Sequence, residues 1–254
     1  RIKDYDEIRK DPQDTITFDA DLSKEISKRV ESLGADGKLL PNEHGDIHYV
    51  TLVGKLLTLS LAKLSNFIPD GGIWLNTQRP EWNDANNALV GSGVSMVTAC
   101  YLHRWFKFLE EWFLNTATDS FQVSSEVAAF FEQIDNALEQ PIASNGSERF
   151  QMVEALSKAG SNYRNGLYSA GLCGQTVGLT REGCIDFFKT ARRHLDGTLR
   201  SNRRSDGLYH SYNLLDWRDD TLEIEPLYEM LEGQVAVLSS GLLTATESVE
   251  VLDA

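Results

Sequence analysis

The sequence predicts an all-α protein, because apolar residues recur at helical spacing along most of its 254 residues and strand-like alternation is weak. Strong turn signals such as Pro69-Asp70-Gly71-Gly72 separate the helical stretches. Hydrophobic residues make up 41% and charged residues 24%, which is typical of a globular chain. We therefore expect residues 1–254 to form a single helical domain with irregular, aromatic-rich loops.

The individual helices follow from apolar periodicity and from residues typical of helix ends. Gly34 ends the first long helix, Thr180 caps a later one, and Pro226 is pre-organised for the start of the last. A stretch at 205–217 is expected to be extended and loop-like. The predicted helices span residues 20–33, 49–66, 85–115, 121–139, 147–171, 181–199 and 226–246.

The overall composition excludes several classes of function. A net charge of −14 disfavours nucleic-acid binding, because an acidic surface repels phosphate backbones. No apolar run reaches the ~18 residues that span a bilayer, and three scattered cysteines indicate neither a disulfide framework nor a metal site. We expect a soluble protein without cofactor or metal, with the cytoplasm favoured. The charged start without Met predicts that the chain is part of a longer multidomain enzyme.

One loop and the helix start after it concentrate side chains that suit sugar binding. Residues 72–87 hold two Trp, one Arg, one Gln, two carboxylates and four Asn. Indole faces stack on sugar rings, amides and guanidinium groups bind hydroxyls, and an acid beside an indole has its pKa raised by desolvation. The predicted substrate-binding residues here are Trp74, Gln78, Arg79, Trp82, Asn83, Asp84 and Asn87.

A purely structural interpretation of this loop stays open. Asp84 is suited to cap the helix that follows, and both Trp side chains are suited to packing. Composition alone favours neither interpretation.

Residues 79–87, with the letters RPEWNDANN, resemble the acid-bearing loop of the (α/α)6-toroid glycosidases. They are most similar to the segment of the cellobiose phosphorylase-like group that contains Trp-Asn-Asp. In that family the carboxylate just before Trp-Asn-Asp protonates the glycosidic oxygen, which implies this role for Glu81. The chain has Glu at this position where the family has Asp, and Ala85 where the family has Gly. The resemblance implies a toroid, or a partial toroid, of paired helices.

The resemblance also implies an inverting cleavage of a glycosidic bond in an oligosaccharide or glycoside, by a hydrolase or a phosphorylase. Toroid enzymes commonly supply their second carboxylate from a late loop or helix start. Glu225, Glu229 and Glu232 have suitable positions, and Glu232 is the predicted base because it interrupts an apolar run. For Glu225 and Glu229 a favourable interaction with the helix dipole is the simpler interpretation.

Two further segments have open interpretations. Residues 206–213, which include Tyr209 and His210, fit either a substrate loop or a structural connection. An arginine-rich run at 192–204 fits either a bound phosphate or a solvated helix end, and no clear phosphate-binding loop accompanies it. The alternative function is a non-catalytic carbohydrate-binding or interaction domain, which keeps the Trp side chains but needs no acid.

Overall fold

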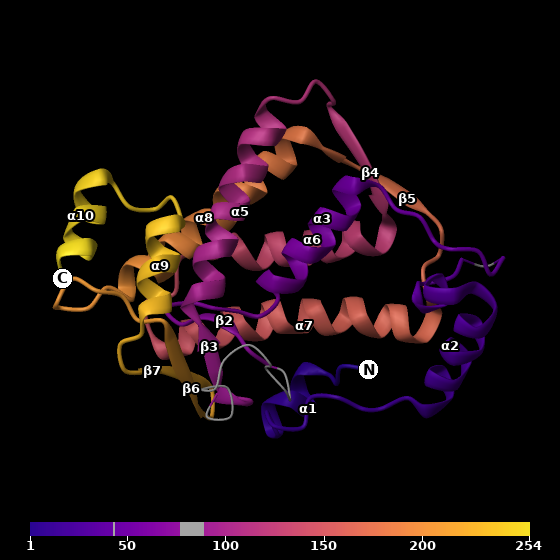
Figure 1. The fold of residues 1–254 in the computed structure, drawn as a ribbon, viewed down its shortest axis with the longest axis horizontal. Helices are drawn as coiled ribbons and strands as arrows, with labels where there is room; N and C mark the ends of the chain where they lie inside the picture. The colour runs from indigo at the N-terminus through magenta and orange to yellow at the C-terminus, as the bar shows by residue number, and fades with distance from the viewer. Residues whose placement is uncertain (43, 77–88) are drawn as a thin grey trace.

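The computed structural model describes residues 1–42, 44–76 and 89–254. It corrects the predicted all-α toroid, because the described part of the chain is mixed α/β. A curled antiparallel sheet of five short strands lies at one end of a layer of helices, and a separate pair of strands lies at the other end (Figure 1).

The helices at 20–33, 49–66, 147–171 and 181–199 are confirmed, with small changes at their ends. The helix at 121–139 is confirmed only from Ser125, because residues 120–124 form a strand. The Thr180 hydroxyl caps its helix as expected, accepting a hydrogen bond from the Gly183 amide at 3.1 Å. The helices described are α1 (Tyr5–Lys10), α2 (Ala20–Leu33), a 3-10 turn η1 (Gly34–Lys38), α3 (Leu52–Leu64), α5 (Met96–Leu114), α6 (Ser125–Leu138), α7 (Gly146–Ala170), α8 (Arg181–Ser201), α9 (Leu231–Ser239) and α10 (Ala245–Asp253).

Two predicted helices are wrong in their extent. The long helix begins at Met96, because residues 93–95 pair in the sheet and Ser95 caps the helix. Residues 85–88 of the predicted range lie outside the described residues. The helix predicted at 226–246 is not continuous. Its first residue ends a strand, and two separate helices, α9 and α10, follow. Pro226 ends the edge strand of the sheet, a position where a residue without an amide hydrogen is tolerated.

The sheet has the strand order β1-β2-β3-β6-β7, with antiparallel pairing throughout. Its first three strands have only two or three residues and are buried, so they carry no alternating pattern. Asp219, at a φ of 47°, begins the two-residue turn between the last two strands. The strands are β1 (Phe67–Ile68), β2 (Gly72–Trp74), β3 (Gly93–Ser95), β6 (Tyr212–Arg218) and β7 (Thr221–Pro226), and the separate pair is β4 (Ser120–Ser124) with β5 (Thr176–Thr180).

Two hydrophobic clusters hold these elements together. The larger, which we call the main core, packs α5 against α8 and α6 against α7, and joins Leu61 to a group of phenylalanines. The smaller, which we call the sheet core, lies between the five-stranded sheet, α1 and α7. Trp74, Phe150 and Leu215 belong to it, and Trp217 packs against it. Trp74 and Val94, which stand before and after residues 77–88 in the sequence, therefore both belong to the sheet core.

No helix among the described residues combines the length and the apolar character needed to cross a bilayer.

Candidate functional site

The segment with the strongest sequence signal lies mostly outside the described residues. Gln78, Arg79, Glu81, Trp82, Asn83, Asp84 and Asn87 all fall within residues 77–88. The structure does describe both attachment points, which are the end of β2 and the start of β3. These two strands pair with each other and lie inside the sheet, between β1 and β6.

Trp74 belongs to the sheet core and is not a surface ring. Its side chain is 3% exposed, its indole lies 5.7 Å from that of Trp217, and its Nε1–H donates to the Gly91 carbonyl at 2.8 Å. The burial and the hydrogen bond of this indole therefore match the structural interpretation of Trp74. Asn76, two residues later, donates from Nδ2 to Asn66 Oδ1 at 2.6 Å.

The other two predicted segments, 206–213 and 225–234, lie against each other. The Gln234 side chain accepts from the Tyr209 amide at 2.8 Å and donates to the Tyr209 carbonyl at 2.7 Å. Ser211 Oγ donates to the Met230 carbonyl at 3.0 Å and accepts from the Gly233 amide at 2.8 Å. A Cβ at Gly233 would come within 2.4 Å of that hydroxyl, so the close contact requires glycine.

Tyr209 and His210 have mainly structural contacts. Tyr209 is buried, and His210 is half-buried with Nδ1 donating to the Leu227 carbonyl at 3.2 Å. Because a carbonyl can only accept, this bond assigns the hydrogen to Nδ1 of His210. Both residues help to dock β6 on the chain that leads to α9.

Glu232 is exposed in the first turn of α9 and lies close enough to Tyr212 to affect its ionisation. Burial raises the pKa of the Tyr212 hydroxyl, and the nearby Glu232 carboxylate adds to this effect, with a smaller contribution from Tyr101. Tyr212 therefore stays protonated at neutral pH and can donate a hydrogen bond. The carboxyl group and the two phenol groups come from α9, β6 and α5, three elements that only the tertiary structure brings together.

The sheet connects Tyr212 to β3, the strand that follows residues 77–88 in the sequence. Ser95, the last residue of β3, pairs with Tyr212 in β6, and the Met96 amide donates to the Ser211 carbonyl at 3.0 Å. β3 thus borders the predicted segment at 206–213, which in turn contacts the segment at 225–234 through the bond from the Leu227 amide to the Tyr212 carbonyl. The predicted segments at 206–213 and 225–234 therefore belong to one unit made of the sheet and α9.

A polar network that the sequence analysis missed fixes the turn before β2. Asn213 Nδ2 donates to the Gly71 carbonyl at 2.8 Å and to Asn202 Oδ1 at 2.9 Å. Asn202 Nδ2 donates to the Asp70 carbonyl at 2.7 Å, and the Thr198 hydroxyl accepts from the Asp70 amide at 3.0 Å. Asp70 has a φ of 61°, a conformation that needs such support. The sequence did not indicate that Asn213, in a stretch expected to be loop-like, would hold this turn.

The arginine-rich run is engaged by carboxylates. Arg192 pairs with Glu110 at 2.5 Å, and Arg204 pairs with Asp206 at 2.7 Å and with Glu229 at 3.1 Å. Arg200 and Arg203 bind glutamates of α10. Four arginines of the run therefore have acidic partners within the chain. The described residues contain no group of three His, Cys, Asp or Glu side chains placed to hold a metal ion.

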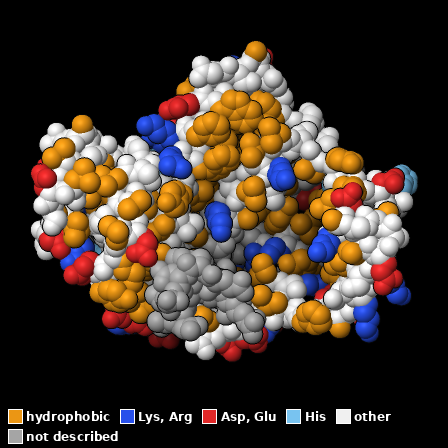
Figure 2. Space-filling view, viewed as in Figure 1, with side chains coloured by type: hydrophobic (Ala, Val, Ile, Leu, Met, Phe, Trp, Pro, Cys, Tyr) orange, Lys and Arg blue, Asp and Glu red, His pale blue; other side chains and the backbone are white. Residues whose placement is uncertain are grey.

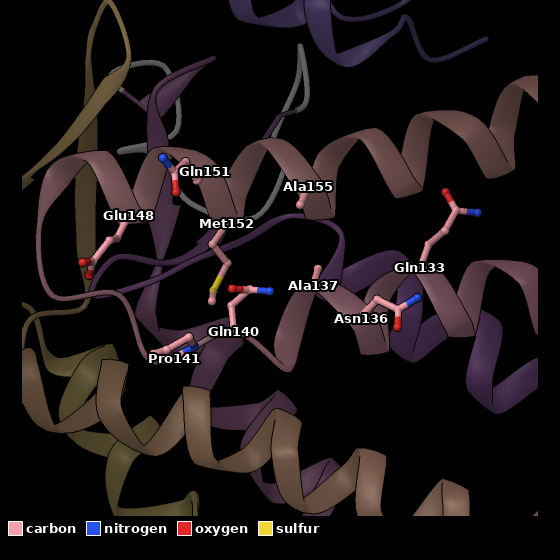
Figure 3. A pocket seen from close by; sticks show the side chains of 9 residues that line it. All are labelled: Gln133, Asn136, Ala137, Gln140, Pro141, Glu148, Gln151, Met152 and Ala155. Atoms are coloured by element: carbon pink, nitrogen blue, oxygen red, sulfur yellow. The ribbon is translucent and has the colours of Figure 1, made fainter.

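A polar pocket of about 510 Å³ lies outside the predicted segments, between α6 and α7 (Figure 3). Side-chain amides surround it, and Met152 and Ala137 form part of its apolar surface. Glu148 at its rim accepts from the Ser144 amide and hydroxyl, both at 2.8 Å, and these bonds lower the pKa of Glu148. The lining amides belong to Gln133, Asn136, Gln140 and Gln151.

Neither the protein-family models nor the curated proteins with which the chain was compared give a match.

Proposed function

We propose that the chain cleaves a glycosidic bond in an oligosaccharide or glycoside, with Glu81 as general acid and Glu232 as general base. The observation that carries this proposal is the 79–87 segment and its resemblance to the acid-bearing loop of the cellobiose phosphorylase-like group. Because the fold is not an all-α toroid, the proposal rests on that segment and not on shared architecture.

The position of the segment supports the proposal. It is inserted between β2 and β3, and β3 pairs with the strand that carries Tyr212 beside Glu232. A carboxyl group near a protonated phenol group is suited to bind sugar hydroxyls and to activate water.

The proposed reaction is an inverting displacement. Glu81 gives its proton to the glycosidic oxygen as the bond from that oxygen to the anomeric carbon breaks. Glu232 takes a proton from the water that attacks the opposite face of that carbon. The two carboxyl groups of inverting enzymes are ~6.5–9.5 Å apart, which leaves room for this water.

The test compares the wild-type chain with Glu81→Gln and Glu232→Gln on a panel of oligosaccharides, with and without inorganic phosphate. We expect each variant to lose roughly 10²–10⁴-fold in turnover, the usual contribution of a general acid or base. Sugar affinity, measured by calorimetry, should change little, and the first product released should have the inverted anomeric configuration by NMR. Sugar phosphate as product would identify a phosphorylase.

The matched control is Glu225→Gln, which removes an exposed carboxylate from the nearby edge strand β7 and should leave turnover unchanged. Near-normal turnover in Glu81→Gln would reject Glu81 as the acid. Sugar binding by the wild-type chain without cleavage of any substrate in the panel would instead favour a non-catalytic carbohydrate-binding domain.

A further inference from the structure

A groove of about 480 Å³ lies at the end of the molecule that carries β4 and β5, away from the sheet and α9. We call it the β4 groove. It is formed by α3, β4, the start of α6, the second half of α7 and the chain segments at 48–51 and 172–176. Its volume falls in the range of roughly 300–1,000 Å³ that is usual for small-molecule sites. None of the residues proposed for glycoside cleavage lines it.

The walls of the β4 groove are mainly apolar and partly open to solvent. Leu59 of α3 is 57% exposed and Val50 is 53% exposed, whereas Val123 and Val127 are buried in its floor. Figure 2 shows hydrophobic side chains gathered over α3 and the neighbouring part of α5 on this face of the molecule. Such apolar surface favours a ligand with an apolar body, because burying it from water releases free energy in proportion to its area.

The groove is held open by internal contacts. The Thr51 hydroxyl donates to the Gln122 carbonyl at 2.8 Å, which ties the start of α3 to β4. The Tyr163 ring stacks on Phe130 with centroids 4.6 Å apart and an angle of 13° between the rings. Burial raises the pKa of Tyr163, and a hydrogen bond between the Tyr163 and Thr58 side chains, which connects α7 to α3, opposes this shift. The site is therefore preformed, and binding need not order its walls.

The charge of the groove is opposite to that of the chain. The lining residues, all of them described, include no Asp or Glu, although 38 of the 254 residues of this chain are acidic. They do include Lys55 and His48. No carboxylate among the described residues forms a salt bridge with Lys55. An ammonium group without an acidic partner beside an apolar groove favours an anionic ligand.

We propose that the β4 groove binds a small amphiphilic carboxylate, whose aliphatic or aromatic body fills the groove and whose carboxylate pairs with Lys55. The apolar walls distinguish this site from the amide-lined pocket between α6 and α7 (Figure 3), which offers hydrogen bonds and the Glu148 carboxylate. A neutral sugar would form no ion pair with Lys55 and would bury little apolar surface against the walls of the groove. The proposal does not depend on the proposed glycosidic activity.

The test measures binding of decanoate to the full chain by calorimetry, beside its uncharged methyl ester. We expect decanoate to bind the wild type roughly tenfold more tightly than the ester does, as a charge-assisted hydrogen bond would give. Lys55→Gln should remove this difference by weakening decanoate about tenfold while leaving the ester unchanged. The matched control is Lys63→Gln, two turns further along α3, exposed and outside the groove, which should change neither affinity.

A second variant locates the apolar part of the ligand. Leu59→Glu places a negative charge on an exposed position of the wall and should abolish decanoate binding without affecting the fold. Decanoate and ester binding equally well, or Lys55→Gln binding decanoate like the wild type, would overturn the proposal. So would self-association of the chain that Leu59→Glu abolishes and that saturating decanoate does not inhibit, because a second copy would then be the occupant.

Discussion

The main core and the sheet core hold their elements in place by different means. In the main core Phe188 lies 5.8 Å from Phe106 and 5.1 Å from Phe113, ring centroid to centroid, and each ring is almost completely buried. In the sheet core β1, β2 and β3 are very short, and side-chain hydrogen bonds from Asn202 and Asn213 fix the turn that precedes β2. The free energy gained by burying apolar surface does not depend on direction, whereas a hydrogen bond requires a defined distance and angle. The hydrogen bonds of Asn202 and Asn213 therefore fix the position of the turn before β2.

The difference indicates where a candidate site can be built. The main core stabilises the layer of helices, and the sheet core positions the strands between which residues 77–88 are inserted. A loop that has to present an acid to a substrate benefits from rigid attachment. We therefore expect substitutions in the main core and in the sheet core to destabilise different parts of the molecule.

The largest expected effect comes from Phe188→Ala in the main core. The ring is fully buried among other aromatic rings, so its loss should cost about 3–5 kcal/mol in the free energy of unfolding. Urea denaturation followed by circular dichroism measures this change. Phe108→Ala is the control, because that ring is 52% exposed, and it should cost less than half as much. Equal losses in the two variants would contradict the assignment of Phe188 to the main core.

Asn213→Ala should have a smaller and more local effect. It leaves the Gly71 carbonyl and Asn202 Oδ1 without their donor, which should cost about 1–3 kcal/mol. Hydrogen exchange should show faster opening of β2, β3 and β6 with little change in α5 and α8. Asn162→Ala removes an exposed amide that bonds to Gln133 and serves as control. If all these elements open equally, the two cores form one cooperative unit and the comparison fails.

The smallest effect concerns α10, which contributes only Val251 to the main core. Hydrogen bonds from the Thr244 amide and then from Arg200 lower the pKa of Glu247 to about 2. This folded-state value lies below the value of about 4.3 in an unfolded chain. The contribution of Glu247 to stability is therefore present above the unfolded value and is lost as the pH falls through about 2.

An NMR titration of the Thr244 and Glu247 amides measures this pKa directly. The midpoint should lie near pH 2 in the wild type and should rise towards the ordinary glutamate value in Arg200→Gln, which removes one of the donors. A wild-type midpoint at the ordinary value would show that the cap is not formed in solution.

Local signals in the sequence were sufficient for most of the helices. Apolar periodicity and the Thr180 cap predicted α8 closely, and the glycine at 34 correctly ended α2. The alternation in β7, with Leu222 and Ile224 between polar residues, was a usable strand signal that the helical interpretation overlooked. Strands β1 to β3 gave no such signal, because two or three buried residues cannot display a period of two.

The sequence by itself determined the helical layer, the acidic charge and the segment 79–87 with its proposed acid, Glu81, because each is a property of neighbouring residues. Only the tertiary structure decided that Trp74 is a core residue and that Tyr101, Tyr212 and Glu232 lie near one another. It also decided that the β4 groove lacks acidic residues. The physical reason is that these features depend on contacts between elements far apart in the chain, and local periodicity carries no information about such contacts.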